Sequence, residues 1–157
     1  MRAIDLAPPM VVTAEESTNL AEAARMMRHH GVGNLVITRF DGRSLQPIGI
    51  VTDRDIVVHA IACGLDPAGI SVADLCTREP AAVDAGADLF EITAAMNEHG
   101  VRRVVVTRES ELVGIISMDN VIEAMAEVLG QLSGMLAQQI EYEQEHLVAA
   151  EPQNNAA

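Results

Sequence analysis

Residues 49–55 read Gly-Ile-Val-Thr-Asp-Arg-Asp, and residues 114–120 read Gly-Ile-Ile-Ser-Met-Asp-Asn. Both stretches begin with a short apolar run that is typical of a strand. In both, a hydroxyl side chain ends the run and a polar side chain follows three positions later. Acidic residues at this point favour the start of a helix, because carboxylates are stabilised at a helix N-terminus. The sequence therefore predicts the same strand-to-helix junction twice, with helices that begin at Asp53 and Asp119.

The similarity between the two junctions extends over most of the chain. A shift of 69 positions aligns His30-Gly31-Val32 with His99-Gly100-Val101, and a shift of 65 aligns the two junctions. The four extra residues lie between positions 40 and 47, in a stretch that reads as a surface loop. Because the register is kept on both sides of this insertion, we interpret the chain as a tandem repeat. We expect a first copy at 1–68, a second copy at 69–130, a C-terminal helical extension at 131–148 and a disordered tail at 149–157.

Each copy has the same predicted order of elements, β-α-β-β-α. A short extended piece leads to a helix with an apolar period near 3.6, which Ser17 or Thr18 is expected to cap in the first copy. Gly31 and Gly100 follow this helix, where a left-handed residue is needed. Two apolar strands then form an antiparallel hairpin before the second helix. The extended pieces are expected at 10–12 and 81–83, and the hairpin strands at 35–38 with 48–51 and at 104–107 with 112–116.

The predicted fold class is α/β (α+β), with the two units packed about a pseudo-two-fold axis. A unit of about 60 residues barely supports a core of its own, so the copies are expected to cover each other's apolar faces.

Composition excludes several classes of function. The 157 residues carry a formal charge of −13, and all 10 basic residues are arginines. Binding of nucleic acid through phosphate neutralisation is therefore not expected. No apolar run approaches the roughly 18 residues that span a bilayer, and no secretory signal is visible. We expect a cytoplasmic protein with no membrane partner.

The chain also lacks the usual signs of catalysis and metal binding. It contains no Gly-x-Ser-x-Gly elbow, no His-Glu-x-x-His and no Walker lysine. Cys63 and Cys76 are too few for a disulfide framework or a zinc site, and the five histidines do not show metal-ligand spacing. The prediction is a protein that is not an enzyme and requires no cofactor.

The two junctions allow two interpretations. In the first, Thr52 or Ser117 caps the helix, and the residue three positions on returns the hydrogen bond in a capping box. In the second, the hydroxyl and the carboxylate together bind a vicinal diol such as a ribose, while N–H groups at the helix start face a phosphate. The residues alone do not decide between a capping box and a ribose-binding site.

The order, spacing and duplication of these motifs resemble the tandem cystathionine-β-synthase (CBS) domain pair, or Bateman module, over roughly residues 3–127. Asp5-Leu6-Ala7-Pro8-Pro9 and residues 73–80 are similar to its lead-in segments, and Gly49–Asp55 is similar to its Thr/Ser-x-x-Asp hallmark. The resemblance implies a regulatory module that binds an adenosyl compound, such as AMP, ADP, ATP, NAD or S-adenosylmethionine, in clefts between the repeats.

The resemblance also implies which residues bind the ligand. Thr52 and Asp55 match the ribose pair of the first copy, and Ser117 and Asn120 match that of the second. The strand residues beside adenine match Val11 and Val12 in one copy and Ala81 and Ala82 in the other. The basic residues beside phosphate match Arg54, Arg102 and Arg103, and the position of the last two is taken by Gly33 and Asn34 in the first copy.

The second ribose pair departs from the family pattern, because Asn120 loses the charge-assisted hydrogen bonds of a carboxylate. We therefore expect one competent site around Thr52 and Asp55. An alternative to phosphate binding is that Arg54, Arg102 and Arg103 are simply surface charges in contact with solvent. A different class of function, a constitutive interaction or scaffold protein with degenerate sites, is favoured by Asn120 and by Gly33-Asn34.

The C-terminal segment carries an apolar stripe on an acidic background. Residues 1–108 hold all 10 arginines and 14 acids, whereas residues 109–157 hold 9 acids and no base. The stripe predicts a helix from Asp119 to His146, which Gly130 and Gly134 could bend. This helix packs either on its own module or on a second copy; we expect a homodimer that acts on an unknown protein partner.

Overall fold

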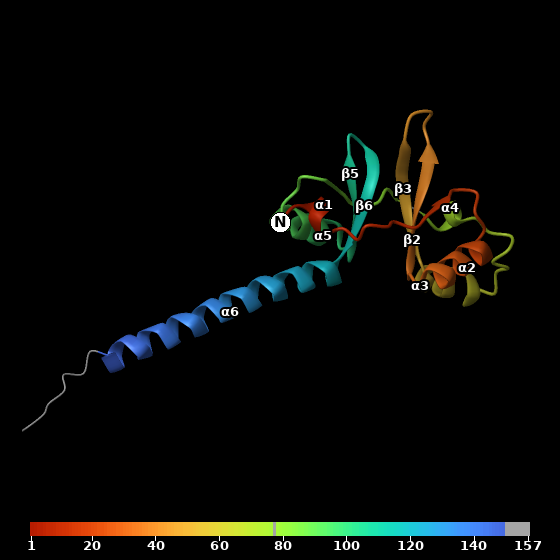
Figure 1. Cartoon of the computed structure of the whole chain (residues 1–157). Helices are drawn as coiled ribbons and strands as arrows, with labels where there is room; N and C mark the ends of the chain where they lie inside the picture. The colour runs from red at the N-terminus through yellow and green to blue at the C-terminus, as the bar shows by residue number, and fades with distance from the viewer. Residues whose placement is uncertain (77, 150–157) are drawn as a thin grey trace, which may run out of the picture. The chain divides into compact units, whose positions relative to one another are not determined.

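Two three-stranded sheets, one from each copy, form the centre of the structure, which is a computed structural model (Figure 1). In each sheet a short parallel strand pairs with the first strand of an antiparallel hairpin. Both hairpins have a register shift at the equivalent place, Ile37/Thr38 and Val106/Thr107. The repeat and the α/β fold class are therefore confirmed. The strands are β1 (Thr13–Glu15), β2 (Asn34–Phe40), β3 (Leu45–Thr52), β4 (Ala82–Asp84), β5 (Arg103–Arg108) and β6 (Glu111–Ser117).

The structure describes residues 1–76 and 78–149. The chain divides into two compact units, residues 1–121 and residues 122–157. The tail expected at 149–157 lies outside the described residues except for Ala149, where the last helix ends.

The first helix of each copy ends as the sequence predicts. Helices α2 (Leu20–His30) and α5 (Leu89–His99) both stop at a left-handed glycine, Gly31 with φ 67° and Gly100 with φ 62°. The expected cap was wrong: Ser17 and Thr18 lie in a turn, and the side chain of Asn19 accepts a hydrogen bond of 2.9 Å from the N–H of Glu22.

The extended pieces at 10–12 and 81–83 also need correction. Strand β1 begins at Thr13 and β4 at Ala82, so Val11, Val12 and Ala81 precede the strands that they were expected to form. The carbonyls of Val12 and Ala81 still accept hydrogen bonds of 3.1 and 2.9 Å from the hairpin strands. Val12 and Ala81 are therefore hydrogen-bonded to the hairpin strands through their carbonyls, just before the regular strands begin.

The second helices differ between the copies. Helix α3 (Asp53–Asp55) continues as the π-helix η1 (Ile56–Ile61), in which the N–H of Ala62 donates to the carbonyl of Val57 at 2.9 Å. Gly64, just beyond this helix, is a left-handed residue. Helix α6 (Met118–Ala149) runs without interruption through Gly130 and Gly134. No helix within the described residues is long and apolar enough to cross a membrane.

Two short helices, which the predicted β-α-β-β-α unit lacks, join the copies. Helix α1 (Ala3–Leu6) begins the chain yet packs beside β6, and α4 (Val72–Leu75) follows the first copy's helices and packs beside β3 (Figure 1). The N–H of Ala3 donates to the carbonyl of Ala87 at 2.8 Å, and the N–H of Val72 donates to the carbonyl of Thr18 at 2.8 Å. Each lead-in segment is thus bonded to the other copy.

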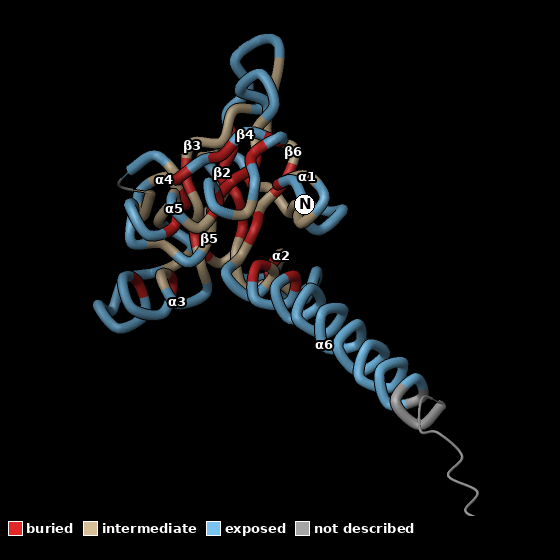
Figure 2. The backbone as a smooth tube through the Cα atoms, turned by 90° about the vertical axis from the view of Figure 1, so that its left-hand side faces the viewer, coloured by how far each residue is buried: buried red, intermediate tan, exposed pale blue. Residues whose placement is uncertain are grey.

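The same exchange builds the two hydrophobic cores. Ala3 is buried with Ile92 and Ile116 of the second copy, whereas Val72 is buried with Leu20 and Val51 of the first. Figure 2 shows the buried residues concentrated along the central strands of this unit. Residues 1–121 form one module because neither core is complete without the lead-in helix of the other copy.

The glycine of each junction has a steric reason. A Cβ at Gly49 would lie 2.5 Å from Sγ of Cys76, and a Cβ at Gly114 would lie 2.7 Å from Cβ of Ala7. Cys76 and Ala7 directly follow α4 and α1. Glycine at positions 49 and 114 therefore leaves room for the segments after α4 and α1 to pack against the strands.

Gly49→Ala should destabilise the module by about 1–3 kcal/mol, because overpacking forces side chains and backbone to shift. Thermal unfolding would measure the loss. Cys76→Gly removes both atoms that the new Cβ would meet, so a double-mutant cycle should show that it offsets part of the cost. Gly130→Ala is the control, since its Cβ would have no neighbour within 4 Å. Equal and additive effects at Gly49 and Cys76 would contradict the steric explanation.

Candidate functional site

The junction of the first copy holds its hydroxyl and carboxylate in one fixed arrangement. Oγ1 of Thr52 donates to Oδ2 of Asp55 at 2.7 Å and accepts from the N–H of Asp55 at 3.1 Å. The N–H of Thr52 also donates to Oδ2 of Asp55, at 2.9 Å. All the bonds that the carboxylate accepts end on Oδ2, and among the described residues no donor reaches Oδ1. The capping box exists, and it leaves one carboxylate oxygen for another donor.

The same hydrogen bonds recur at two other places. Ser117 donates from its N–H and Oγ to Oδ1 of Asn120 at 2.9 and 2.7 Å. Ser71, the N-cap of α4, makes equivalent bonds of 2.9 and 2.7 Å to Oδ2 of Asp74, and they hold the pKa of that carboxyl below its usual range. The local motif is therefore a general helix start, and only its surroundings can distinguish a binding site.

A cleft of about 590 Å³ surrounds the Thr52–Asp55 junction, a volume within the usual range for small-molecule sites. The first copy contributes the end of β3 and the start of α3. The second copy contributes the segment before β4 and the start of β5. The lining residues are Ile50, Thr52, Asp53, Arg54, Asp55, Arg78, Glu79, Pro80, Ala81, Gly100, Val101, Arg102 and Arg103.

Four arginines converge on this cleft, which also contains three carboxylates. The arginines are Arg54, Arg78, Arg102 and Arg103. None of them forms an ion pair with another described residue, whereas arginines elsewhere pair with Asp5, Glu22 and Glu16. The cleft therefore presents guanidinium groups that remain available to an anion.

The structure brings together six of the residues singled out from the sequence. The residues that line this cleft are Thr52, Arg54, Asp55, Ala81, Arg102 and Arg103. The residues that do not line it are Val11, Val12, Ala82, Gly33, Asn34, Ser117 and Asn120. Sequence reasoning missed Arg78 and Glu79 as lining residues. Their position just before Ala81 was a usable signal, because a base of the ligand was expected against that residue.

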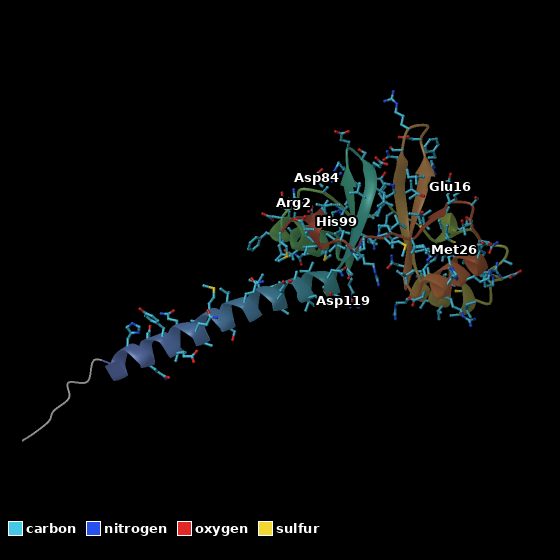
Figure 3. All side chains as sticks on the ribbon, in the orientation of Figure 1. Arg2, Glu16, Met26, Asp84, His99 and Asp119 are labelled. Atoms are coloured by element: carbon cyan, nitrogen blue, oxygen red, sulfur yellow. The ribbon has the colours of Figure 1, made fainter. Side chains whose placement is uncertain are left out.

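The positions that the repeat relates to this cleft have a different charge. Gly33 and Asn34 stand where the second copy has Arg102 and Arg103, and Pro9 stands where it has Arg78. Asp119, in the first turn of α6 (Figure 3), takes the place of Arg54. The set around Ser117 and Asn120 thus carries no arginine and a single acid, Asp119, because Met118, Asn120 and Met10 stand where the cleft has Asp53, Asp55 and Glu79. The two sets of residues are alike in backbone hydrogen bonds and opposite in charge.

The described residues offer little for other chemistry. They contain no group of three His, Cys, Asp or Glu side chains that could hold a metal ion. Burial raises the pKa of the Cys76 thiol, which disfavours the reactive thiolate at neutral pH. His99, at the end of α5 (Figure 3), is exposed and its Nδ1 lies 2.9 Å from the carbonyl of Ala95.

The family model of the CBS domain matches residues 4–61 and 72–127. The chain therefore belongs to the CBS-domain family, as a tandem pair.

Three known proteins illustrate the relationship. Hypoxic response protein 1 of Mycobacterium tuberculosis is 38% identical over 117 residues, which cover 74% of this chain and 80% of that protein. A crystal structure of Hypoxic Response Protein I with two coordinated zinc ions has a TM-score of 0.67 at 36% identity, and the match covers 78% of this chain and 98% of that one.

The CBS domain protein PAE2072 from Pyrobaculum aerophilum, complexed with AMP, has a TM-score of 0.68 at 28% identity, over 76% of this chain and 89% of that one. A hexameric CBS-CP12 protein from bloom-forming cyanobacteria has a TM-score of 0.68 at 25% identity, over 78% and 69%. CBS-pair proteins of this kind are generally regulatory, and members of the family form oligomers.

Asp55→Asn should change the free energy of unfolding by less than about 0.5 kcal/mol, within the range of ordinary surface changes. The reason is that Asn120 already makes the same bonds in the second copy. Thr52→Ala should cost about 1 kcal/mol, the usual value of a lost N-cap. Chemical denaturation would compare the two. A loss for Asp55→Asn as large as that for Thr52→Ala would show that the charge itself stabilises the junction.

Proposed function

We propose that the cleft around Thr52 and Asp55 binds an adenine nucleotide and that the protein is a non-catalytic regulator. The observation that carries this proposal is the convergence of a preformed Thr–Asp pair and four ion-pair-free arginines on one cleft. The AMP bound to the related Pyrobaculum protein supports the same class of ligand.

The carboxylate of Asp55 is suited to the sugar of the ligand. Its Oδ1 can accept a hydrogen bond from a ribose hydroxyl, while Oδ2 stays bonded to Thr52. Because the pair is already fixed by these bonds, binding does not have to order it. Ile50 of the first copy and Ala81 of the second add apolar side chains to the lining of the cleft, against which the base can pack.

The arginines are suited to phosphate. Guanidinium groups bind phosphate oxygens in a bidentate manner, and here they come from both copies: Arg54 from the first, and Arg78, Arg102 and Arg103 from the second. They favour AMP, ADP, ATP or an NAD-type dinucleotide over S-adenosylmethionine, which carries a positive charge on sulfur. The proposed specificity is therefore for a phosphorylated adenosine.

The proposed signal follows from the fact that residues of both copies line the cleft. A ligand that bonds to Asp55 and to Arg102 at once favours one mutual arrangement of the copies. The carbonyl of Arg102 accepts a hydrogen bond of 2.9 Å from the N–H of Met118, the first residue of α6. Binding at this arginine thus acts on the residue at which α6 begins. The proposal includes a homodimer and a separate protein partner that reads the change.

Isothermal titration calorimetry of the full chain should find one binding event per chain for AMP and for ATP, and weaker binding of unphosphorylated adenosine. Asp55→Ala should weaken binding at least about tenfold, because a hydrogen bond to a charged group contributes roughly 1.5–3 kcal/mol. Asp74→Ala is the matched control, since Asp74 makes the same bonds to Ser71 but does not line the cleft. Equal losses in both variants would argue against a ribose role for Asp55.

A second candidate function is a constitutive interaction or scaffold protein. The absence of arginine from the positions around Ser117 and Asn120 favours it, because one set of family positions lacks the basic residues that would bind a phosphate. Thermal unfolding separates the candidates: a ligand at 100 times its Kd stabilises a protein by about 2.7 kcal/mol. No shift with AMP, ATP or NAD would favour the scaffold, and two equal binding events would contradict the single-site proposal.

A further inference from the structure

Helix α6 carries a stripe of exposed apolar side chains. Beyond its first turns the helix is exposed along its length (Figure 2), and its large apolar side chains are between 40 and 65% accessible. Exposed apolar surface of this extent usually marks an interaction site. The stripe consists of Ile122, Met125, Leu129, Leu132, Leu136 and Ile140.

The spacing of the stripe is that of a helix-pairing seam. From Ile122 to Leu136 the intervals are three, four, three and four residues, the a and d positions of two heptads. Glu123 and Glu127 fall on the opposite face of the helix. A partner helix along the stripe would therefore meet no charge between residues 122 and 140.

The spacing is also nearly the same when it is read backwards. Two copies of α6 that run in opposite directions about a midpoint between residues 130 and 131 place Leu129 opposite Leu132 and Met125 opposite Leu136. Ile122 then lies opposite residue 139, beside Ile140. In an antiparallel pair each a position meets a d position of the other helix, so every residue of the stripe finds an apolar neighbour.

The charge at the far end of the stripe favours one direction of pairing. Beyond the stripe, the same face of the helix continues to Glu143, and residues 109–157 contain no Lys or Arg to neutralise it. In a parallel pair the two Glu143 side chains would face each other across the seam. In the antiparallel pair Glu143 falls opposite Met118 of the other copy, whose N–H is bonded to the backbone of Arg102.

We propose that α6 is the dimerisation element and that two copies pair it antiparallel through the stripe. The occupant of the stripe is a second copy of this chain. This inference deepens the homodimer part of the proposed function and does not depend on nucleotide binding, which calorimetry tests separately.

Sedimentation equilibrium of the full chain should show a dimer. Replacing the two central residues together, Leu129→Gln and Leu132→Gln, should raise the dimer dissociation constant by more than roughly 30-fold, as expected for hot-spot residues at the centre of an interface. Both side chains are exposed in the single chain, so the module of residues 1–121 should keep its thermal unfolding. The matched control, Gln131→Ala with Gln138→Ala, changes the opposite face and should remain a dimer.

The direction of pairing is measured by distances between spin labels. In a chain with Cys63→Ser, Cys76→Ser and Glu141→Cys, an antiparallel pair separates the two labels by roughly 30 Å along the helix axis, at 1.5 Å per residue. A parallel pair would give no axial separation. A short distance would overturn the antiparallel arrangement, and a dimer that survives the double leucine change would overturn the role of the stripe. A monomeric full chain, or a helix that pairs only with another protein, would overturn the homodimer as well.

Discussion

The structure depends on an exchange in which each copy completes the core of the other. Helices α1 and α4 are short, and each is buried through one small apolar residue, Ala3 or Val72, among side chains of the opposite copy. A unit of about 60 residues has too little interior to be stable alone. The exchange removes that weakness, and it requires glycine at positions 49 and 114, where the crossing segments lie against the central strands.

The position of the cleft follows from the same exchange. The crossing segment that carries α4 continues through Arg78 and Ala81, which brings these residues of the second copy to the end of β3 in the first. The residues of the proposed site therefore come from both copies as a direct result of how the cores are closed. A ligand bound as proposed would contact both copies at once, which is where a regulatory ligand could change their arrangement.

The repeat relates two sets of residues that have diverged in charge but not in backbone geometry. Thr52–Asp55 and Ser117–Asn120 make the same hydrogen bonds, because an amide oxygen accepts from a hydroxyl and an N–H as a carboxylate does. The helix start is thus formed with either an aspartate or an asparagine at the third position. The charge next to the junction can differ between the copies, because Arg54 and Asp119 lie on exposed first turns of their helices, where a positive or a negative side chain is accommodated.

Local patterns along the chain were enough to predict the repeat, the β-α-β-β-α order within each copy, the glycine ends of α2 and α5, and the resemblance to the CBS family, but not the short helices α1 and α4. The predicted features follow from local periodicity and from a register that two copies must share. The sequence did not show the cap at Asn19, the start of β1 at Thr13 or the π-helix η1, because they depend on hydrogen bonds with segments that are distant in the chain or on one-residue adjustments within a turn.

Which residues share a cleft depends on how the two copies pack. Arg78 looks like part of a linker in the sequence, and Thr52–Asp55 looks the same as Ser71–Asp74. Thr52 and Asp55 line a cleft with four arginines, whereas Ser71 and Asp74 lie outside it. The reason is that the start of α4 is bonded to the segment before α2, where the N–H of Val72 donates to the carbonyl of Thr18. Local motifs fix hydrogen bonds between near neighbours, whereas the charge around them is set by chain segments that only the packed cores bring together.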